Sequence, residues 1–128
     1  MAFRVVRLGS PRMKNEGLRI GTVRRPPRGV PKALFAEDNW FDIWFPELAP
    51  SDEAFEIAKA AQTPQDWAKF AKLYRAEMSA PDKQRLLKLL AEFSAQTMFS
   101  VGCYCEDESR CHRSVLRALL EEAGAYPA

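Results

Sequence analysis

The sequence predicts an α/β fold in which a small, mainly parallel sheet is flanked by helices. Short segments with alternating apolar residues lie near the start of the chain, and three segments with the apolar spacing of helices follow them. A further strand pattern then leads into a last helix, an order typical of α/β folds. With 128 residues, of which 47% are hydrophobic, the chain is expected to form a single domain over residues 1–128.

Two short strands are predicted near the N-terminus. Apolar residues at positions 3–8 form the first, and the alternation of Leu18, Ile20 and Thr22 predicts the second. The next segment, residues 24–31 (RRPPRGVP), contains three prolines. Because proline fixes φ and lacks an amide hydrogen, this segment is expected to be a rigid, basic connector.

Three consecutive helices are predicted from their start signals. Ser51 and Thr63 are typical N-cap residues, and Pro81 suits the first turn of a helix. The side chains expected on the core faces of these helices are Ala54, Phe55 and Ala58, then Trp67, Phe70, Ala71, Tyr74 and Met78, and finally Leu86, Leu87, Leu90 and Phe93.

The last strand and the last helix are predicted from the C-terminal third of the chain. Residues 97–104 carry apolar or small side chains at both alternating sets of positions, which is typical of a central strand. Helices are therefore expected on both sides of the sheet. Ser109 is expected to cap a last helix that ends near Gly124.

The composition argues against several classes of protein. A formal net charge of +2 is too small to indicate a polyanionic partner, so nucleic acid is not the favoured partner. No segment approaches the roughly 20 apolar residues that cross a bilayer, and the N-terminus lacks the apolar run of a secretory signal. We therefore expect a cytoplasmic protein without membrane association, whose three cysteines are thiols or metal ligands.

The segment from Cys103 to Arg113, between the last strand and the last helix, is the most informative one for function. In open α/β sheets, ligands bind beyond the carboxyl ends of the strands, where a helix start presents free N–H groups. His112, the only histidine, and Cys111 are the candidate catalytic residues. Because neighbouring helical side chains point about 100° apart, these two are not expected to form a hydrogen-bonded pair.

Arginines around this segment predict an anionic ligand. Arg24 and Arg28 lie on the proline-stiffened connector, which presents them at low entropic cost. The carboxylates of residues 106–108 repel an anion, so the site needs the connector arginines to converge on it. We expect a small anionic or nucleotide-like ligand, with the following binding residues: Arg24, Arg28, Arg113 and Cys105.

Two other functions are compatible with the sequence. The first alternative is a non-enzymatic thiol or zinc-binding module. Its four soft donors, of the kind that bind zinc, are Cys103, Cys105, Cys111 and His112. Structural zinc sites usually pair ligands about two to four residues apart, whereas Cys111 and His112 are adjacent, so neither a metal nor another cofactor is expected. The second alternative is a protein-interaction domain that uses an aromatic patch of Trp40, Phe41, Trp44 and Phe45.

Several separated motifs resemble the YeaO-like family, also known as domain of unknown function 488. The residues that carry the resemblance are Arg24 with Pro27, Arg28, Gly29 and Val30; Trp44 with Leu48, Ala49, Pro50 and Ser51; Trp67, Phe70, Tyr74 and Glu77; and Cys111, His112 and Arg113. The resemblance implies a compact α/β domain with Arg28 near the Cys-His-Arg turn, and it implies no established activity. Many YeaO-like members have asparagine at the position of Cys111, so the resemblance favours His112 and the arginines over a thiol nucleophile.

Overall fold

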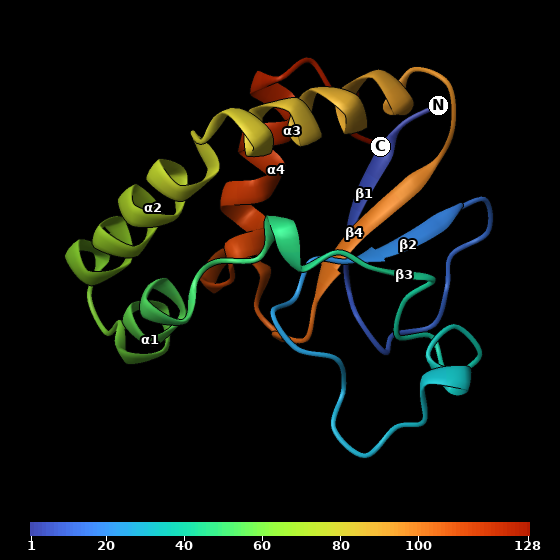
Figure 1. Ribbon diagram of the computed structural model, residues 1–128, viewed down its shortest axis with the longest axis horizontal. Helices are drawn as coiled ribbons and strands as arrows, with labels where there is room; N and C mark the ends of the chain where they lie inside the picture. Colours follow the sequence, from blue (N-terminus) through green and yellow to red (C-terminus); the bar gives the residue numbers. More distant parts are fainter.

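The computed structural model describes residues 1–128 and contains one four-stranded sheet in which all strands are parallel (Figure 1). The strand order is β1 (Phe3–Arg7), β4 (Phe99–Cys103), β2 (Leu18–Gly21) and β3 (Ile43–Trp44). The mainly parallel α/β fold expected from the sequence is thereby confirmed. The two N-terminal strands do not pair with each other, because β4 lies between them.

The central strand β4 is buried on both faces, and all five of its residues are inaccessible to solvent. Phe99 and Val101 belong to the main apolar core. Ser100 points to the opposite face, where its hydroxyl donates a hydrogen bond to Glu16 at 2.8 Å. Two-sided burial therefore confirms the central strand that the sequence predicts, since both sets of alternating side chains are covered.

The first three helices begin where their start signals predict. Helix α1 (Asp52–Ala60) and helix α2 (Pro64–Met78) follow Ser51 and Thr63, whose hydroxyl oxygens each accept a hydrogen bond from the N–H group three residues later. Helix α3 (Pro81–Ser94) has its proline in the first turn, where the missing N–H breaks no intrahelical bond. Local capping therefore determines where these helices start.

The last helix, α4 (His112–Glu122), begins later than the sequence analysis expects. Ser109 lies instead in a short 3-10 helix, η3 (Glu108–Arg110). The carboxylate of Asp107 accepts hydrogen bonds from the N–H and the hydroxyl of Ser109, at 3.0 and 2.7 Å. The prediction of a Ser109 cap is wrong because Asp107 caps η3 and places Ser109 inside that short helix, and the extended residue Cys111 becomes the N-cap of α4.

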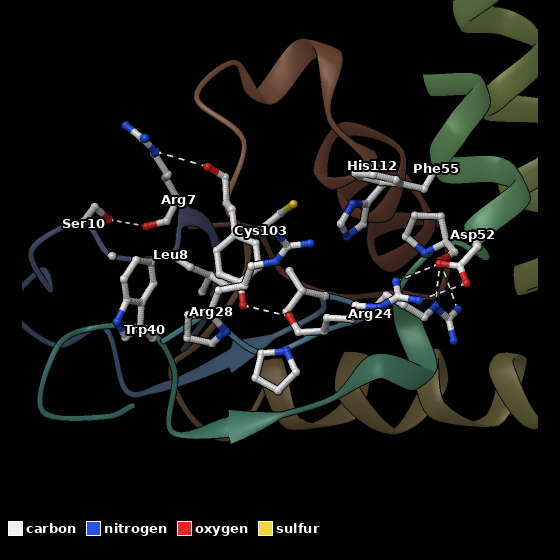
Figure 2. Close-up of a pocket in the computed structure, with 17 residues that line it drawn as sticks. Arg7, Leu8, Ser10, Arg24, Arg28, Trp40, Asp52, Phe55, Cys103 and His112 are labelled. Atoms are coloured by element: carbon white, nitrogen blue, oxygen red, sulfur yellow. Dashed lines mark hydrogen bonds and ion pairs between the residues drawn. The ribbon is translucent and has the colours of Figure 1, made fainter. Parts of the chain in front are cut away.

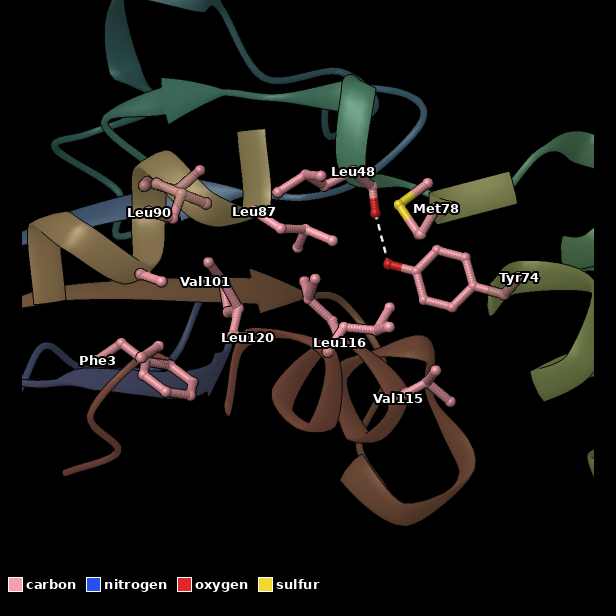
Figure 3. Close-up of a cluster of buried hydrophobic side chains, with 14 of the residues drawn as sticks. Phe3, Leu48, Tyr74, Met78, Leu87, Leu90, Val101, Val115, Leu116 and Leu120 are labelled. Carbon is pink, nitrogen blue, oxygen red and sulfur yellow. Dashed lines mark hydrogen bonds between the residues drawn. The ribbon is translucent and has the colours of Figure 1, made fainter. Parts of the chain in front are cut away.

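All four helices contribute to one apolar core, on one face of the sheet (Figures 1 and 3). This core contains 17 buried side chains, among them Ala54 of α1, Phe70 of α2, Leu87 of α3 and Leu116 of α4. The expectation of helices on both sides of the sheet is wrong, since loops cover the other face. None of the helices combines the length and the apolar composition needed to cross a membrane.

The loops after β1 and β2 cover the second face of the sheet. A smaller apolar cluster of Leu8, Val23, Phe41, Cys103 and Cys111 lies beneath these loops and at the carboxyl ends of the strands. The 3-10 helices η1 (Lys32–Leu34) and η2 (Pro46–Leu48) lie in the long connection between β2 and α1. This connection includes the aromatic segment, whose structure the periodicity of the sequence does not indicate.

A buried ion pair also supports the loop-covered face. Glu16 and Arg19 are 2% and 0% exposed, and Oε2 of Glu16 lies 2.8 Å from Nε of Arg19. The guanidinium of Arg19 also donates to the backbone carbonyls of Ser10 and Asn39, at 2.8 Å each. Since the charges are paired and the donors satisfied, the burial of both groups is tolerated.

Replacing Tyr74 by phenylalanine is expected to lower the free energy of unfolding by about 1–3 kcal/mol. The hydroxyl of Tyr74 donates to the carbonyl oxygen of Leu48 at 2.7 Å in the buried core (Figure 3), so its removal leaves that carbonyl unsatisfied. Urea denaturation measures the loss. The matched control is Tyr104→Phe, because the half-buried Tyr104 donates to the carbonyl of Arg25 near solvent. Equal losses in both variants contradict the prediction.

Candidate functional site

The carboxyl ends of three strands and the start of α4 surround a cleft of about 970 Å³ (Figure 2). Arg7 ends β1 and Cys103 ends β4, while Val23 and Arg24 follow β2 and His112 begins α4. All five residues line the cleft. Parallel strands end at the same edge of a sheet, which explains how residues so far apart in the sequence meet here.

The cleft carries more positive than negative charge. Its charged lining consists of Arg7, Arg24, Arg25, Arg28 and one carboxylate, Asp52. Asp52 and Arg25 form two charge-assisted hydrogen bonds of 2.9 and 3.3 Å, and these hold the pKa of Asp52 below its ordinary value. Arg24 donates to the backbone carbonyls of Ala49 and Pro50 and forms no salt bridge, although its charge contributes to the lowered pKa of Asp52. Arg28 makes no hydrogen bond or ion pair, and its guanidinium is available to a ligand (Figure 2).

Three aromatic side chains also line the cleft: Trp40, Phe55 and Tyr104. The rings of Trp40 and Tyr104 are in edge contact, with their centroids 5.9 Å apart. Phe55 is 48% exposed, so the expectation that it lies on the core face of α1 is wrong. Ala54 occupies the core position of that helix, and the neighbouring Phe55 lies at the cleft instead.

The aromatic segment considered as an interaction patch is divided in the structure. Phe41 is buried in the smaller apolar cluster, and Phe45 packs against the main core. Trp44 is 44% exposed and donates its indole N–H to the carbonyl of Val23 at 2.8 Å. Trp40 lines the cleft. The four rings therefore do not share one exposed surface.

His112 is oriented by the backbone that follows β2. Its Nε2 lies 2.8 Å from the carbonyl oxygen of Thr22. Because a carbonyl can only accept, Nε2 carries the proton and Nδ1 has the free lone pair. Nδ1 lies 3.8 Å from Sγ of Cys111. The expectation that these neighbours cannot pair is wrong, since Cys111 is an extended N-cap (φ −129°, ψ 153°) and not a helical residue.

The three cysteines and His112 form one cluster. Sγ of Cys103 lies 3.7 Å from Sγ of Cys105, and the ligating atoms of Cys103, Cys111 and His112 lie within 4.8 Å of one another. Hydrogen bonding to Cys105 and Cys111, together with burial, raises the pKa of Cys103. The same hydrogen bonding with Cys103 lowers the pKa of Cys105 and of Cys111. Negative charge in the cluster is therefore least favoured on Cys103.

Arg113 lies beside this cluster and does not line the cleft. It is 3% exposed, and its Nη2 donates to the backbone carbonyl of Cys105 at 2.6 Å. Its Nε is buried without a hydrogen-bond partner. The guanidinium also contributes to the lowered pKa of Cys105, after the larger effect of hydrogen bonding with the other two thiols. Arg113 therefore supports the loop of the cysteine cluster.

The acidic loop of residues 106–108 is directed away from the cleft lining. Glu108 pairs with Arg117 at 2.9 Å, and Asp107 bonds to Ser109. Glu106 lies 3.5 Å from Arg7. None of the three carboxylates lines the cleft, so the repulsion expected from the sequence is reduced there.

The candidate residues from the sequence divide into two neighbouring groups. Those that line the cleft are Arg24, Arg28 and His112. Those that lie outside its lining are Cys105, Cys111 and Arg113. Residues that the sequence analysis does not single out also contribute: Arg7 and Tyr104 in the cleft, and Thr22 as the partner of His112. Each stands at or just after the carboxyl end of a strand, which is the signal that identifies them.

Comparisons with known proteins give one match. Neither a curated protein nor a solved structure matches the chain. The family model DUF488-N3a, described as the active DUF488-N3 subclade, matches residues 3–124. The matched region contains every residue of the cleft and of the cysteine cluster. The resemblance to the YeaO-like proteins is thereby confirmed, and the chain belongs to the DUF488 family.

Proposed function

We propose that this protein binds a small anionic, nucleotide-like ligand in the cleft at the carboxyl edge of its sheet. The observation that carries the proposal is a lining with four arginines and one carboxylate, in which Arg24 and Arg28 form no salt bridge. Arg25 is paired with Asp52, and Arg7 is paired with Glu106, which lies outside the lining. Uncompensated guanidinium groups in a concave site attract phosphate or carboxylate and bind it with directed hydrogen bonds.

Arg28 is the residue on which the anion contact depends most. Its guanidinium has no partner within the protein, whereas Arg24 is held by backbone carbonyls and Arg25 by Asp52. Pro26 and Pro27 precede it and also line the cleft. Because these prolines restrict the backbone, little conformational freedom is lost when Arg28 binds a ligand.

The aromatic lining favours a nucleotide over a simple anion. A volume of about 970 Å³ falls at the upper end of the range for small-molecule sites. Trp40 and Tyr104 offer ring faces and edges for a base, next to the arginines that suit a phosphate. Arginines and aromatic rings in one cleft match the two parts of a nucleotide.

Binding is favoured over nucleophilic catalysis by a thiol. Cys103 is the only cysteine that lines the cleft, and its pKa is raised by hydrogen bonding to the other two thiols and by burial. A raised pKa keeps a thiol protonated and therefore weakly nucleophilic. The candidate catalytic residues His112 and Cys111 face each other and not a ligand: Nε2 of His112 is bound to Thr22, and its Nδ1 is directed to Cys111.

Replacing Arg28 by alanine is expected to weaken the binding of AMP by roughly 10–100-fold, the effect of losing a charge-assisted hydrogen bond. Isothermal titration calorimetry with AMP and with inorganic phosphate measures the change. Binding of both probes to the native protein should weaken as salt is added, since the contact is ionic. Trp40→Ala should lower the affinity for AMP and leave that for phosphate unchanged.

Lys32→Ala is the matched control, because Lys32 is an exposed cation four residues further on that does not line the cleft. It should bind AMP as the native protein does. The proposal is overturned if the native protein binds neither AMP nor phosphate, or if Arg28→Ala and Lys32→Ala bind AMP equally well.

A further inference from the structure

Four soft donor atoms lie beside the arginine-lined cleft, and two of them belong to Cys103 and His112, which line it. Cys103 ends the central strand β4, and Cys111 and His112 stand at the start of α4, with their ligating atoms within 4.8 Å of one another. Cys105 adds a third sulfur, 3.7 Å from that of Cys103. Cys103, Cys111 and His112 are all buried.

The spacing of these atoms agrees with that of ligands around one tetrahedral zinc ion. With zinc–sulfur bonds of about 2.3 Å, two sulfurs of a tetrahedron lie about 3.8 Å apart, and a sulfur and a nitrogen are slightly closer. Sγ of Cys103 and Sγ of Cys105 are 3.7 Å apart, and Sγ of Cys111 lies 3.8 Å from Nδ1 of His112. Cys105 is not among the three residues whose ligating atoms all lie within 4.8 Å of one another, so its side chain must shift to complete the site.

His112 is already oriented as a metal ligand. Histidines that bind a metal through one ring nitrogen usually donate the other N–H to a carbonyl or a carboxylate, which fixes the ring. The Nε2–H of His112 donates to the carbonyl of Thr22 at 2.8 Å, and the free lone pair of Nδ1 is on the side of the sulfur of Cys111. The backbone therefore holds the imidazole in the tautomer that a metal requires.

The surroundings also balance the charge of such a site. Three thiolates and a divalent cation leave an excess of negative charge, which needs a nearby positive group. The buried guanidinium of Arg113 bonds to the carbonyl of Cys105, and its Nε has no partner in the protein. The N-terminal end of α4, with the positive end of its dipole, lies at Cys111.

We propose that Cys103, Cys105, Cys111 and His112 bind a zinc ion. This inference goes beyond the proposed ligand binding, because the metal site uses sulfurs and a ring nitrogen, and no arginine of the cleft. Structural zinc sites are usually recognised in a sequence by pairs of ligands about two to four residues apart, and this site lacks that spacing. Its ligands come together because the end of strand β4 lies beside the start of helix α4. The metal then joins β4 to α4 at the edge of the cleft, where Cys103 and His112 belong to the lining.

The metal content of the full chain tests this proposal. Protein purified from cells grown with zinc is expected to contain stoichiometric zinc by inductively coupled plasma mass spectrometry. Cobalt titrated into the metal-free protein should give thiolate-to-cobalt charge transfer in the near ultraviolet and the strong visible absorption of tetrahedral cobalt. Absence of stoichiometric metal, or a weak spectrum typical of octahedral cobalt, overturns the proposal.

Variants identify the ligands. Loss of a residue that only hydrogen-bonds to a metal ligand lowers metal affinity by roughly 10–100-fold. Cys111→Ser and His112→Gln remove ligands themselves, so each should lower the affinity for zinc by more than this. Ser109→Ala is the matched control in the same loop, because Ser109 bonds only to Asp107 and offers no ligand. Cys105→Ser should change the cobalt charge-transfer band, and an unchanged band excludes Cys105 from the site.

A measurement on the native protein keeps the test valid if the variants fail to fold. Zinc should protect all three cysteines from alkylation, and a chelator should make them reactive, as counted by mass spectrometry. A disulfide in the freshly purified protein, or alkylation that zinc does not slow, overturns the proposal. Arg28→Ala should load zinc normally while losing AMP, which distinguishes failure of the metal site from failure of the proposed function.

Discussion

Replacing Glu16 by glutamine is expected to lower the free energy of unfolding by about 3–5 kcal/mol at neutral pH. Glu16 and Arg19 form a buried ion pair, with Oε2 2.8 Å from Nε. Glutamine cannot neutralise Arg19, so a charged group is left in the interior without its counterion. Urea denaturation followed by circular dichroism measures the loss.

The effect of Glu16→Gln should depend on pH in a defined direction. Burial alone raises the pKa of Glu16, but hydrogen bonds from Arg19, the N–H of Met13 and Ser100 lower it from 4.5 to about 2. A group whose pKa is lower in the folded state stabilises the protein above its unfolded pKa and loses that contribution as the pH falls. The native protein should therefore lose about 3 kcal/mol between about pH 5 and pH 2, and the two proteins should converge in acid.

Glu122→Gln is the matched control for this prediction. It makes the same chemical change in the ion pair of Glu122 with Arg75, whose side chains are 58% and 42% exposed. Solvent screening limits such a pair to about 0–1 kcal/mol, so the control should unfold nearly as the native protein does. Equal losses in the two variants, or an unchanged difference between native protein and Glu16→Gln at acid pH, contradict the assignment.

Replacing Gly17 by alanine is expected to lower the free energy of unfolding by about 3 kcal/mol or more, through two separate effects. Gly17 has a φ of +78°, a conformation that L-residues adopt at a cost of about 1–2 kcal/mol. A Cβ at this position overlaps the backbone carbonyl of Met98. Met98 directly precedes β4, and the next residue, Phe99, pairs with Leu18 of β2. A backbone atom cannot move aside as a flexible side chain does, so the start of the β2–β4 ladder must shift.

Gly29→Ala separates these two effects. Gly29 has a similar φ of +71°, but a Cβ there meets no atom within 4 Å. This variant should lose only the conformational cost of about 1–2 kcal/mol. Thermal and urea unfolding of both variants give the steric effect as the difference between them. If Gly17→Ala is no less stable than Gly29→Ala, the close approach of β2 and β4 at Met98 is not supported.

The helices show how much of the fold depends on local sequence. Ser51, Thr63 and Pro81 set the starts of α1, α2 and α3, because a cap or a first-turn proline acts within a few residues of chain. The same reasoning fails at Ser109, because the neighbouring Asp107 caps the short helix η3 and Ser109 lies inside it. Ser51 caps α1 although its hydroxyl also donates to Glu77, so a second bond from the hydroxyl does not by itself prevent capping.

The candidate site shows what depends on tertiary structure. The sequence identifies His112 as the only histidine and directs attention to the arginines of the connector. The family resemblance implies that Arg28 lies near the Cys-His-Arg turn, but nothing in the sequence indicates that Thr22 holds the imidazole or that Arg7 and Tyr104 line the same cleft. These contacts join residues far apart in the chain, and only the parallel order of β1, β4 and β2 brings them to the same edge.

The sequence by itself determined the α/β class, the first three helix starts, the central strand and the family of this protein, because each depends on short-range patterns or on separated motifs. Only the tertiary structure decided that all the helices lie on one face of the sheet, that Glu16 and Arg19 are buried together on the other, and that Cys103 and Cys111 lie beside His112. The physical reason is that capping and periodicity act within a few residues, whereas burial and charge pairing depend on which segments the folded sheet brings into contact.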